Sequence, residues 1–479
     1  MCSLMPIQAF YTSNFILPDT NGLYNESSQI PDDEVTLPTV DDLRGAARGL
    51  SRLQQLYKLD ITNITKGYII DQKYSSEMSA YNCYIMGKSL YESEEYLAAS
   101  EWLMEALNKS EEMEKSLAKQ ENIINWCNDN VSNHSEDKDF NCGIGSAECG
   151  IFPYVSITEI LELLGSALYY ADRPELALLV NSRLLSIEPG NEIGLSNKKM
   201  FQPQANIVRR MRFITPGNEQ NKKSEMQNLY EQVCNGEVEQ NMEMKRNLNC
   251  HLTNKNLPYY ILGPLKMEEL NKDPPVAVYY DVIYNEEIKE IIETSKSGIE
   301  RSEIGDIDEG TPDEVRISKN SWLGYDSPIM SRISQRLADI TGLSMDMSEE
   351  MQVANYGIGG YYGTHYDFSE NPDEENPKDG NRILTAMFYL NNVDLGGATA
   401  FPHLRLAVPP IKHSLVVWYN LHKSLEPDYR TAHAGCPVLK GSKWIGNVWF
   451  HTVGQELNRP CDLKPDGDIS KPHKAMGLD

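Results

Sequence analysis

The sequence predicts a multidomain α+β protein, in which an N-terminal helical region precedes an antiparallel β domain with flanking helices. The chain has 479 residues, which is more than one hydrophobic core usually supports. Apolar residues recur at helical spacing through residues 39–201, whereas short β-rich runs separated by turn signals follow from about residue 257. Hydrophobic residues make up 40% of the chain and charged residues 24%, which is a globular composition.

The net charge excludes two broad classes of partner. There are 70 acidic and 44 basic side chains, a formal charge of −26. So negative a surface repels phosphate backbones and anionic lipid surfaces, and we expect no nucleic-acid binding. No apolar run approaches the roughly 18 residues that a membrane helix needs, so no membrane span is predicted.

The first elements are a polar lead and a helix. Residues 1–38 are irregular and polar, and we expect them to be disordered or extended. From residue 40 apolar positions fall on one helical face, and Thr39 with Asp42 forms a plausible capping box. The segment 39–75 is therefore predicted to be the remnant of an N-terminal helical domain.

Two helical hairpins are predicted next, within residues 76–201. Gly87 and Gly165 occupy the close-packing position of a tetratricopeptide-like unit. They are 165 − 87 = 78 positions apart, whereas the repeat period is about 34, so residues 110–153 are predicted to be an insertion. Such repeats usually form a concave peptide-binding surface. The alternative is two unrelated helical hairpins.

The C-terminal half carries the β pattern. Residues 202–227 are predicted to be a linker, residues 228–462 a β domain and residues 463–479 a tail. Two helices, near 284–296 and 327–341, precede most of the strands, which include the runs VAVYYDVI, EMQVANYGIG, ILTAMFYLNN, HSLVVWYNL and KWIGNVWF. The expected architecture is a β-sandwich or double-stranded β-helix (jelly roll) with helices packed outside.

Glycosylation motifs favour a secretory protein. Five N-x-[ST] sequons lie in the N-terminal region, at Asn25, Asn63, Asn108, Asn130 and Asn133. The N-terminal residues lack the basic and apolar regions of a signal peptide, so we expect a true start outside this sequence.

The nine cysteines form no CxxC pair, so zinc ribbons and thioredoxin-like redox sites are not predicted. Cys234 and Cys250 flank a charged loop, and Cys436 and Cys461 flank the last apolar strands. A polar stretch contains the remaining cluster, Cys127, Cys142 and Cys149. From spacing alone, a free buried thiol is about as plausible as a disulfide for each of them.

The chemistry is concentrated in Gly-Thr-His365-Tyr-Asp367. On a strand, residues two apart point to the same face, so His365 and Asp367 would act together. His433 lies just before another predicted strand. Two imidazoles and a carboxylate on one face match the facial triad of non-haem Fe(II) oxygenases. The other histidines of the nine in the chain compete for the third position.

Lys443 narrows the choice of cosubstrate to one that carries an anionic group. It begins the predicted strand KWIGNVWF, and a lysine inside a β-barrel needs an anionic partner. The far carboxylate of a metal-bound dicarboxylate would supply one. The alternative is a surface lysine in the turn LKGSK.

These motifs together resemble a known family. The strings EEMQVANYGIGG, HYDF, GNRILTAMFYLNNV, GGATAFP, VVWYNL, HAGCPVL and KWIGNVWFH make residues 228–462 similar to the catalytic region of collagen prolyl 4-hydroxylase alpha subunits. The resemblance extends over roughly residues 40–462. Related lysyl and oxygen-sensing prolyl hydroxylases place Arg where this chain has Lys443, which favours the collagen-type branch.

The resemblance implies a role for each matching residue. His365, Asp367 and His433 would ligate Fe(II), and Lys443 would pair with the distal carboxylate of 2-oxoglutarate. Three further residues would contact or orient the cosubstrate: Tyr389, Tyr356 and His451. The alternative for these three is a core aromatic or a satisfied histidine.

The resemblance also implies disulfides and a peptide groove. Two intrachain disulfides would join Cys234 to Cys250 and Cys436 to Cys461, and Cys83 would stay unpaired. Proline-rich peptide would bind a tyrosine-lined groove at Tyr96 and Asn197. The chain departs from the family at two groove positions. It has Ile193 where the family has a basic residue, and Met200 where the family has an aromatic residue.

The implied activity is hydroxylation of C4 of proline in X-Pro-Gly sequences, coupled to oxidative decarboxylation of 2-oxoglutarate to succinate and CO2. It would use Fe(II), O2 and ascorbate, with a protein disulfide isomerase as beta subunit, in the endoplasmic reticulum lumen. The family's long N-terminal dimerisation segment and a retention signal are not found in this sequence, so self-association stays open. The alternatives are a 2-oxoglutarate oxygenase acting on a non-collagen substrate and a non-catalytic subunit that binds proline-rich peptides.

Overall fold

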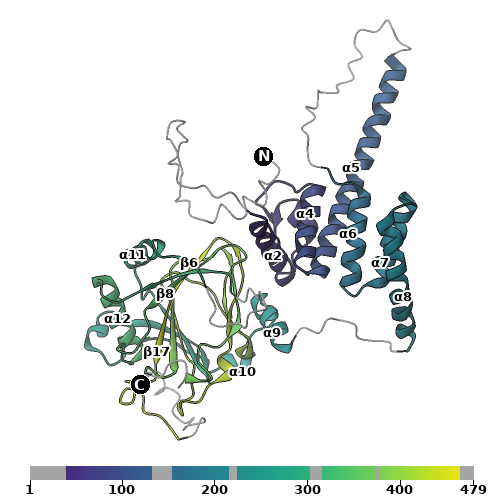
Figure 1. Cartoon of the computed structure of the whole chain (residues 1–479). Helices are drawn as coiled ribbons and strands as arrows, with labels where there is room; N and C mark the ends of the chain where they lie inside the picture. The colour runs from purple at the N-terminus through teal and green to yellow at the C-terminus, as the bar shows by residue number, and fades with distance from the viewer. Residues whose placement is uncertain (1–38, 132–153, 215–223, 303–315, 373–377, 464–479) are drawn as a thin grey trace. The chain divides into compact units, whose positions relative to one another are not determined.

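The computed structural model describes residues 39–131, 154–214, 224–302, 316–372 and 378–463. The predicted lead at 1–38 and most of the tail at 463–479 lie outside these ranges. The chain divides into two compact units, one containing the described residues up to Ile214 and the other those from Ser224 onward (Figure 1). None of the described helices is both long enough and apolar enough to cross a membrane.

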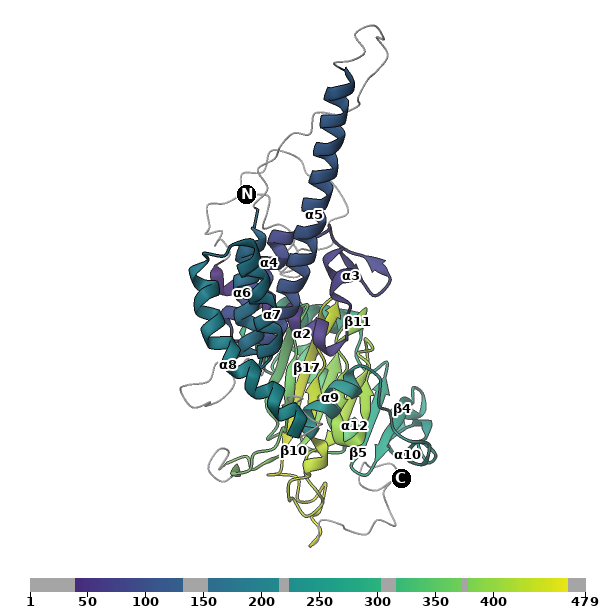
Figure 2. The ribbon, with the colours of Figure 1, turned by 90° about the vertical axis from the view of Figure 1, so that its right-hand side faces the viewer.

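The first unit is helical, with one short hairpin (Figures 1 and 2). Its elements are α2 (Val40–Leu56), α3 (Ile61–Thr65), β1 (Tyr68–Ile69), β2 (Gln72–Lys73), α4 (Ala80–Glu92), α5 (Tyr96–Val131), α6 (Ile157–Tyr170), α7 (Pro174–Ile187) and α8 (Glu192–Ile214). The predicted capping box is present, since Thr39 and Asp42 satisfy each other's backbone N–H groups. Ser79 and Ser156 begin α4 and α6 in the same way.

The core of this unit joins the helical hairpins to the segment before them. Trp102 and Leu103 of α5 are fully buried against α4 and α6. Ala47 of α2 and Ile64 of α3 belong to the same buried cluster. The segment 39–75 is therefore part of one packed helical unit.

Two expected boundaries differ in the structure. The expected insertion at 110–153 begins as a continuation of α5, which runs to Val131, because residues 110–131 hold no proline or glycine and are rich in strong helix formers. The expected linker at 202–227 begins inside α8, which continues past Pro203 to Ile214. Proline removes only one backbone hydrogen bond, and flanking turns can hold such a helix together.

The second unit is built from antiparallel sheets with helices α9 (Glu225–Cys234), α10 (Met242–Lys245), α11 (Asn285–Lys296) and α12 (Pro328–Thr341). A nine-stranded sheet has the order β3-β4-β5-β14-β10-β17-β8-β7-β6, and a four-stranded sheet the order β13-β12-β15-β9. The strands of the larger sheet are β3 (Cys250–Thr253), β4 (Leu265–Lys272), β5 (Pro275–Tyr280), β6 (Glu300–Arg301), β7 (Lys319–Leu323), β8 (Met351–Tyr356), β10 (Arg382–Tyr389), β14 (Leu415–Tyr419) and β17 (Lys443–His451). The smaller sheets contain β9 (Tyr362–His365), β12 (Thr399–Phe401), β13 (Leu406–Val408) and β15 (His433–Gly435), with β11 (Leu395–Gly396) paired to β16 (Val438–Lys440).

The period-2 pattern of the strands separates two cores. On β10, Leu384, Ala386 and Phe388 belong to the cluster that includes residues of α11 and α12. The intervening Met387 and Tyr389 belong to a second cluster shared with the four-stranded sheet. The candidate cosubstrate residues Tyr356 and Tyr389 belong to this second cluster, which faces the inner side of the larger sheet. The predicted α+β class with jelly-roll sheets is confirmed, whereas the tetratricopeptide assignment stays a prediction.

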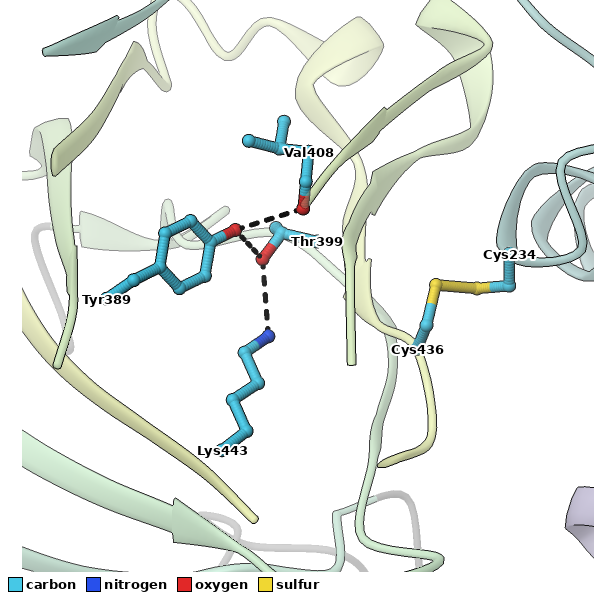
Figure 3. The surroundings of a disulfide bond; sticks show 6 residues. All are labelled: Cys234, Tyr389, Thr399, Val408, Cys436 and Lys443. Atoms are coloured by element: carbon cyan, nitrogen blue, oxygen red, sulfur yellow. Dashed lines mark hydrogen bonds between the residues drawn. A yellow bond between two sulfur atoms is a disulfide. The ribbon is translucent and has the colours of Figure 1, made fainter. Parts of the chain in front are cut away.

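The predicted disulfide pairs are wrong. Cys234, the last residue of α9, bonds Cys436, which follows β15 (Figure 3). Cys250 and Cys461 are free and exposed. The pairing is set by tertiary packing, because α9 packs against β12 and β13 and so brings Cys234 beside the four-stranded sheet. Cys250 instead lies on β3, the edge strand of the larger sheet.

The remaining cysteine predictions have mixed outcomes. Cys83 is a free thiol, as expected, and burial raises its pKa to about 12. Cys142 and Cys149 lie outside the described residues, as does the side chain of Cys127.

Candidate metal and cosubstrate site

Two strands of the smaller sheet bring the predicted triad together. His365 ends β9, His433 begins β15, and the two residues are direct cross-strand partners. Asp367 lies between the rings, with Oδ1 at 3.6 Å from His365 Nε2 and Oδ2 at 3.5 Å from His433 Nε2. The ligand atoms of the three residues all lie within 4.8 Å of one another, a spacing that suits one ion.

The hydrogen bonds of the two imidazoles select the ligand nitrogen. His365 Nδ1 lies 2.8 Å from the carbonyl of Gly363, and His433 Nδ1 lies 3.0 Å from the carbonyl of Thr431. A carbonyl only accepts, so each Nδ1 must donate. Each neutral ring then presents the lone pair of Nε2 toward Asp367, which is the arrangement of metal-ligating histidines.

The protonation states also suit a divalent cation. Burial lowers the pKa of His433 to about 4, which leaves the ring neutral at physiological pH. Burial would raise the pKa of Asp367, but the neighbouring His433, His365 and Arg382 outweigh it and hold that pKa well below its usual range. One carboxylate oxygen and two imidazole nitrogens are the donor set that non-haem Fe(II) sites use.

The triad opens onto a cavity of about 230 Å³ that also contains Lys443. Lys443 begins β17 and is 3% exposed. Its Nζ lies 3.4 Å from Thr399 Oγ1, and no carboxylate pairs with it among the residues that the structure describes (Figure 3). Burial lowers its pKa to about 7. A buried ammonium without a counter-ion fits a site that receives an anion.

The predicted tyrosines surround this lysine. Tyr389 donates its hydroxyl to Thr399 Oγ1 at 2.7 Å, with the Val408 carbonyl at 3.2 Å (Figure 3). Tyr356 is the cross-strand partner of Lys443 and lines the cavity. Lys443 Nζ lies 5.7 Å from the Tyr356 ring centroid and 5.5 Å from that of Tyr389. Both rings therefore help to stabilise the ammonium before an anion arrives.

His451 lies differently from the other predicted cosubstrate residues. It ends β17 and is buried, but it does not line the cavity. Its Nδ1 lies 2.8 Å from the Gly380 carbonyl, and its Nε2 lies 2.9 Å from Glu349 Oε1. Glu349 in turn accepts two hydrogen bonds from Arg382, which does line the cavity. Any influence of His451 on the cosubstrate would pass through this pair.

Comparison with known proteins decides the family. Residues 351–451 match the 2OG-Fe(II) oxygenase superfamily, and residues 15–71 match the N-terminal region of the prolyl 4-hydroxylase alpha-subunit. The chain is 34% identical to prolyl 4-hydroxylase subunit alpha-1 of Gallus gallus over 444 residues, which is 89% of this chain and 79% of the relative. This chain belongs to the prolyl 4-hydroxylase alpha-subunit family. Members of the oxygenase superfamily use Fe(II), 2-oxoglutarate and O2.

Similarity extends to two further proteins. Prolyl 4-hydroxylase subunit alpha-2 of Caenorhabditis elegans is 34% identical over 458 residues, 91% of this chain and 77% of the relative. The solved structure of the viral collagen prolyl hydroxylase vCPH from Paramecium Bursaria Chlorella virus-1 is 26% identical, covering 36% of this chain and 94% of its own, with a TM-score of 0.31.

The oxygenase cavity contains residues that the sequence did not single out. These further lining residues are Arg316, Trp322, Tyr362, Arg382 and Asn447. The Tyr362 ring stacks on His365 with centroids 3.6 Å apart, and Arg316 lies 4.8 Å over Tyr362. Asn447 Oδ1 is buried and has no hydrogen-bond partner among the described residues. The alternation of β17 from Lys443 could have revealed Asn447, but no local signal marks Arg316.

The two residues of this chain that were predicted to line a peptide groove, Tyr96 and Asn197, lie in the helical unit. Tyr96 begins α5, and its ring stacks on Tyr170 with centroids 5.1 Å apart and meets Tyr91 edge-on at 5.4 Å. Asn197 lies on α8, is buried, and its Nδ2 has no partner among the described residues. No described contact joins Tyr96 to Asn197.

The structure describes the asparagine side chains of only two of the five predicted glycosylation sequons. Asn63 and Asn108 are exposed, although each lies within a helix. Asn25 and Asn133 lie outside the described residues, and Asn130 lies on α5 with its side chain outside them.

Proposed function

We propose that this chain hydroxylates C4 of proline in collagen-like X-Pro-Gly peptides. The reaction consumes one 2-oxoglutarate and one O2 per proline. One oxygen atom enters the proline C–H bond, and the other enters succinate as CO2 leaves. The observation that carries the proposal is the His365, Asp367 and His433 triad in one cavity with Lys443, a buried lysine that has no carboxylate partner within the described ranges.

Each part of the site has a defined task. His365, Asp367 and His433 would hold Fe(II), which when bound would accept one end of the cosubstrate as a chelating ligand and activate O2. Lys443 would bind the far carboxylate, which replaces the solvation lost on burial. Tyr389 orients the hydroxyl of Thr399, which can then donate a hydrogen bond to the same carboxylate.

The aromatic part of the cavity lining suits a peptide. Trp322 and Trp449 lie with ring centroids 6.0 Å apart, and Arg382 lies 4.2 Å over Trp449. Proline packs well on aromatic faces, and a proline-rich segment loses little entropy on binding. These rings would hold the target C–H near the triad and exclude water.

A second peptide contact is proposed in the helical unit, which we interpret as tetratricopeptide-like. Tyr170 is 51% exposed and stacks on Tyr96, so the two rings offer a platform for proline. Ile193 and Met200 are exposed on α8, where the family has basic and aromatic residues, and they favour a more apolar peptide. Substituting Tyr96 or Tyr170 with Ala should weaken peptide binding without changing 2-oxoglutarate binding.

The cellular setting follows the same reasoning. The Cys234–Cys436 disulfide supports an oxidising compartment, and the exposed sequons at Asn63 and Asn108 support glycosylation. We propose residence in the endoplasmic reticulum lumen, a protein disulfide isomerase as beta subunit, and ascorbate as the reductant that restores oxidised iron.

The testing experiment uses the chain co-expressed with a protein disulfide isomerase. It is incubated with Fe(II), 2-oxoglutarate, ascorbate and a (Pro-Pro-Gly) repeat peptide, and the peptide mass is measured. A gain of one oxygen per modified proline should be lost in His365→Ala and Lys443→Ala. The control His403→Ala, an exposed histidine outside the cavity, should keep it.

Other results would favour the alternatives. Bound iron and consumed 2-oxoglutarate without a mass gain would mean an oxygenase that acts on a different substrate. A protein that binds peptide but no iron would be a non-catalytic peptide-binding subunit.

A further inference from the structure

Asn420 is a buried asparagine that touches none of the proposed metal ligands directly. It follows β14 and is 0% exposed. By alternation it shares the inner side of the sheet with Val416 and Trp418, which belong to the inner cluster. Its side chain and its backbone each make a hydrogen bond that leads to a different ligand of the triad.

The side chain leads to Asp367 through Thr385. Asn420 Nδ2 donates to Thr385 Oγ1 at 2.9 Å, and Thr385 Oγ1 donates to Asp367 Oδ2 at 2.6 Å. A hydroxyl has one proton, and an amide nitrogen can only donate. The amide therefore directs the threonine proton onto the carboxylate, since the opposite amide orientation would compete for that proton.

The backbone leads to His433. Asp428 N donates to the Asn420 carbonyl at 3.0 Å, and Thr431 Oγ1 donates to the Asp428 carbonyl at 2.7 Å. The carbonyl of Thr431 then accepts from His433 Nδ1 at 3.0 Å. Arg430 donates to both carboxylate oxygens of Asp428, at 2.8 Å each, which fixes this turn.

We propose that the Asn420 side chain is a positioning group that holds the metal ligand Asp367 through Thr385, while the Asn420 backbone anchors the turn that leads to His433. The hydroxyl of Thr385 donates a hydrogen bond to Asp367 Oδ2 and so fixes the plane of this carboxylate. Oδ1 is then left facing His365 Nε2 at 3.6 Å. The inference rests on the metal site of the proposed function and is independent of the substrate.

The test measures metal affinity alone. Mn(II) is titrated into the full chain in complex with its disulfide isomerase, without 2-oxoglutarate or peptide, and free Mn(II) is followed by electron paramagnetic resonance. Loss of a partner that orients a metal ligand typically weakens binding about 10–100-fold. Asn420→Ala, which keeps the backbone carbonyl, and Thr385→Val should both fall in that range. Thr385→Ser keeps the hydroxyl and should bind like the wild type.

A double variant tests the path. If Asn420 acts on Asp367 through Thr385, adding Asn420→Ala to Thr385→Val should weaken metal binding no further. The matched control is Asn391→Ala, because Asn391 is an asparagine that bonds backbone groups of Ser442 and Trp444 away from the triad. It should leave Mn(II) affinity unchanged.

Each outcome separates this inference from the proposed function. Wild-type affinity in Asn420→Ala or in Thr385→Val, or additive losses in the double variant, would overturn the role of Asn420 while leaving the metal site intact. If Asn420→Ala does not fold, Asn420→Asp decides, because a carboxylate cannot donate to Thr385 Oγ1 and would compete for its proton, so this variant should also bind Mn(II) more weakly. A wild-type chain that binds no Mn(II) would overturn the proposed function and this inference together.

Discussion

Raising the pH through neutrality should weaken the binding of 2-oxoglutarate, because Lys443 then loses its charge. Burial lowers the pKa of this lysine to about 7 in the absence of an anion. An anionic carboxylate beside it favours the charged form, so binding raises that pKa again. The cosubstrate therefore binds with uptake of a proton wherever the free lysine is neutral.

The size of the effect follows from the fraction of protein whose lysine is charged. With a pKa of about 7, that fraction is roughly nine-tenths at pH 6 and roughly one-tenth at pH 8. Apparent affinity scales with the competent fraction, so the dissociation constant should rise about 10-fold between these two values, or about 1.4 kcal/mol. His433, whose pKa burial lowers to about 4, does not titrate in this range.

Calorimetry can measure this directly. 2-Oxoglutarate is titrated into Mn(II)-saturated protein at several pH values, and at pH 8 in two buffers of different ionisation enthalpy to count protons taken up. The control is Lys443→Arg, because a guanidinium stays charged throughout this range. Its affinity should be nearly independent of pH. A flat profile for the wild type, with no proton uptake, would refute the reasoning, as would an equally steep profile for Lys443→Arg.

Two further predictions concern stability. Peptide mapping of the non-reduced protein should recover a Cys234–Cys436 cross-link, and recovery of Cys234 joined to another cysteine would contradict the fold. In a denaturant titration, Cys436→Ser should lower the free energy of unfolding by about 2–5 kcal/mol. Gly87→Ala should destabilise the helical unit by about 1–3 kcal/mol, because its new methyl would lie 2.6 Å from Leu103 Cγ. The matched Gly165→Ala, whose nearest neighbour atom is 3.5 Å away, should be neutral or stabilising by up to about 1 kcal/mol, and equal losses in the two variants would contradict the packing.

The triad could be predicted because its chemistry has a local signature. A spacing of two predicted that His365 and Asp367 would act together, although β9 ends at His365, and Lys443 begins a mostly apolar strand. His433 was harder, because only the pairing of β15 with β9 places it opposite His365. The resemblance to a family, not periodicity, selected it among nine histidines.

The remaining features depend on tertiary contacts that a sequence does not display. The partner of Cys234 is set by the packing of α9 on the smaller sheet, and neighbouring cysteines in the sequence give no guide to it. His451 shares the inward face of β17 with Lys443, yet Glu349 and Gly380 hold its ring away from the cavity lining. Strand periodicity therefore gives the face of a residue but not its partner.

The central claim is that this chain is a dioxygenase that splits O2 between a proline and 2-oxoglutarate. The most direct measurement incubates the enzyme, Fe(II), 2-oxoglutarate and the (Pro-Pro-Gly) peptide under isotopically labelled dioxygen, and analyses both products by mass spectrometry. Our account predicts one labelled oxygen in each hydroxylated proline and one in each succinate, formed in equal amounts. Label in succinate alone, or hydroxyproline carrying oxygen from water, would contradict it.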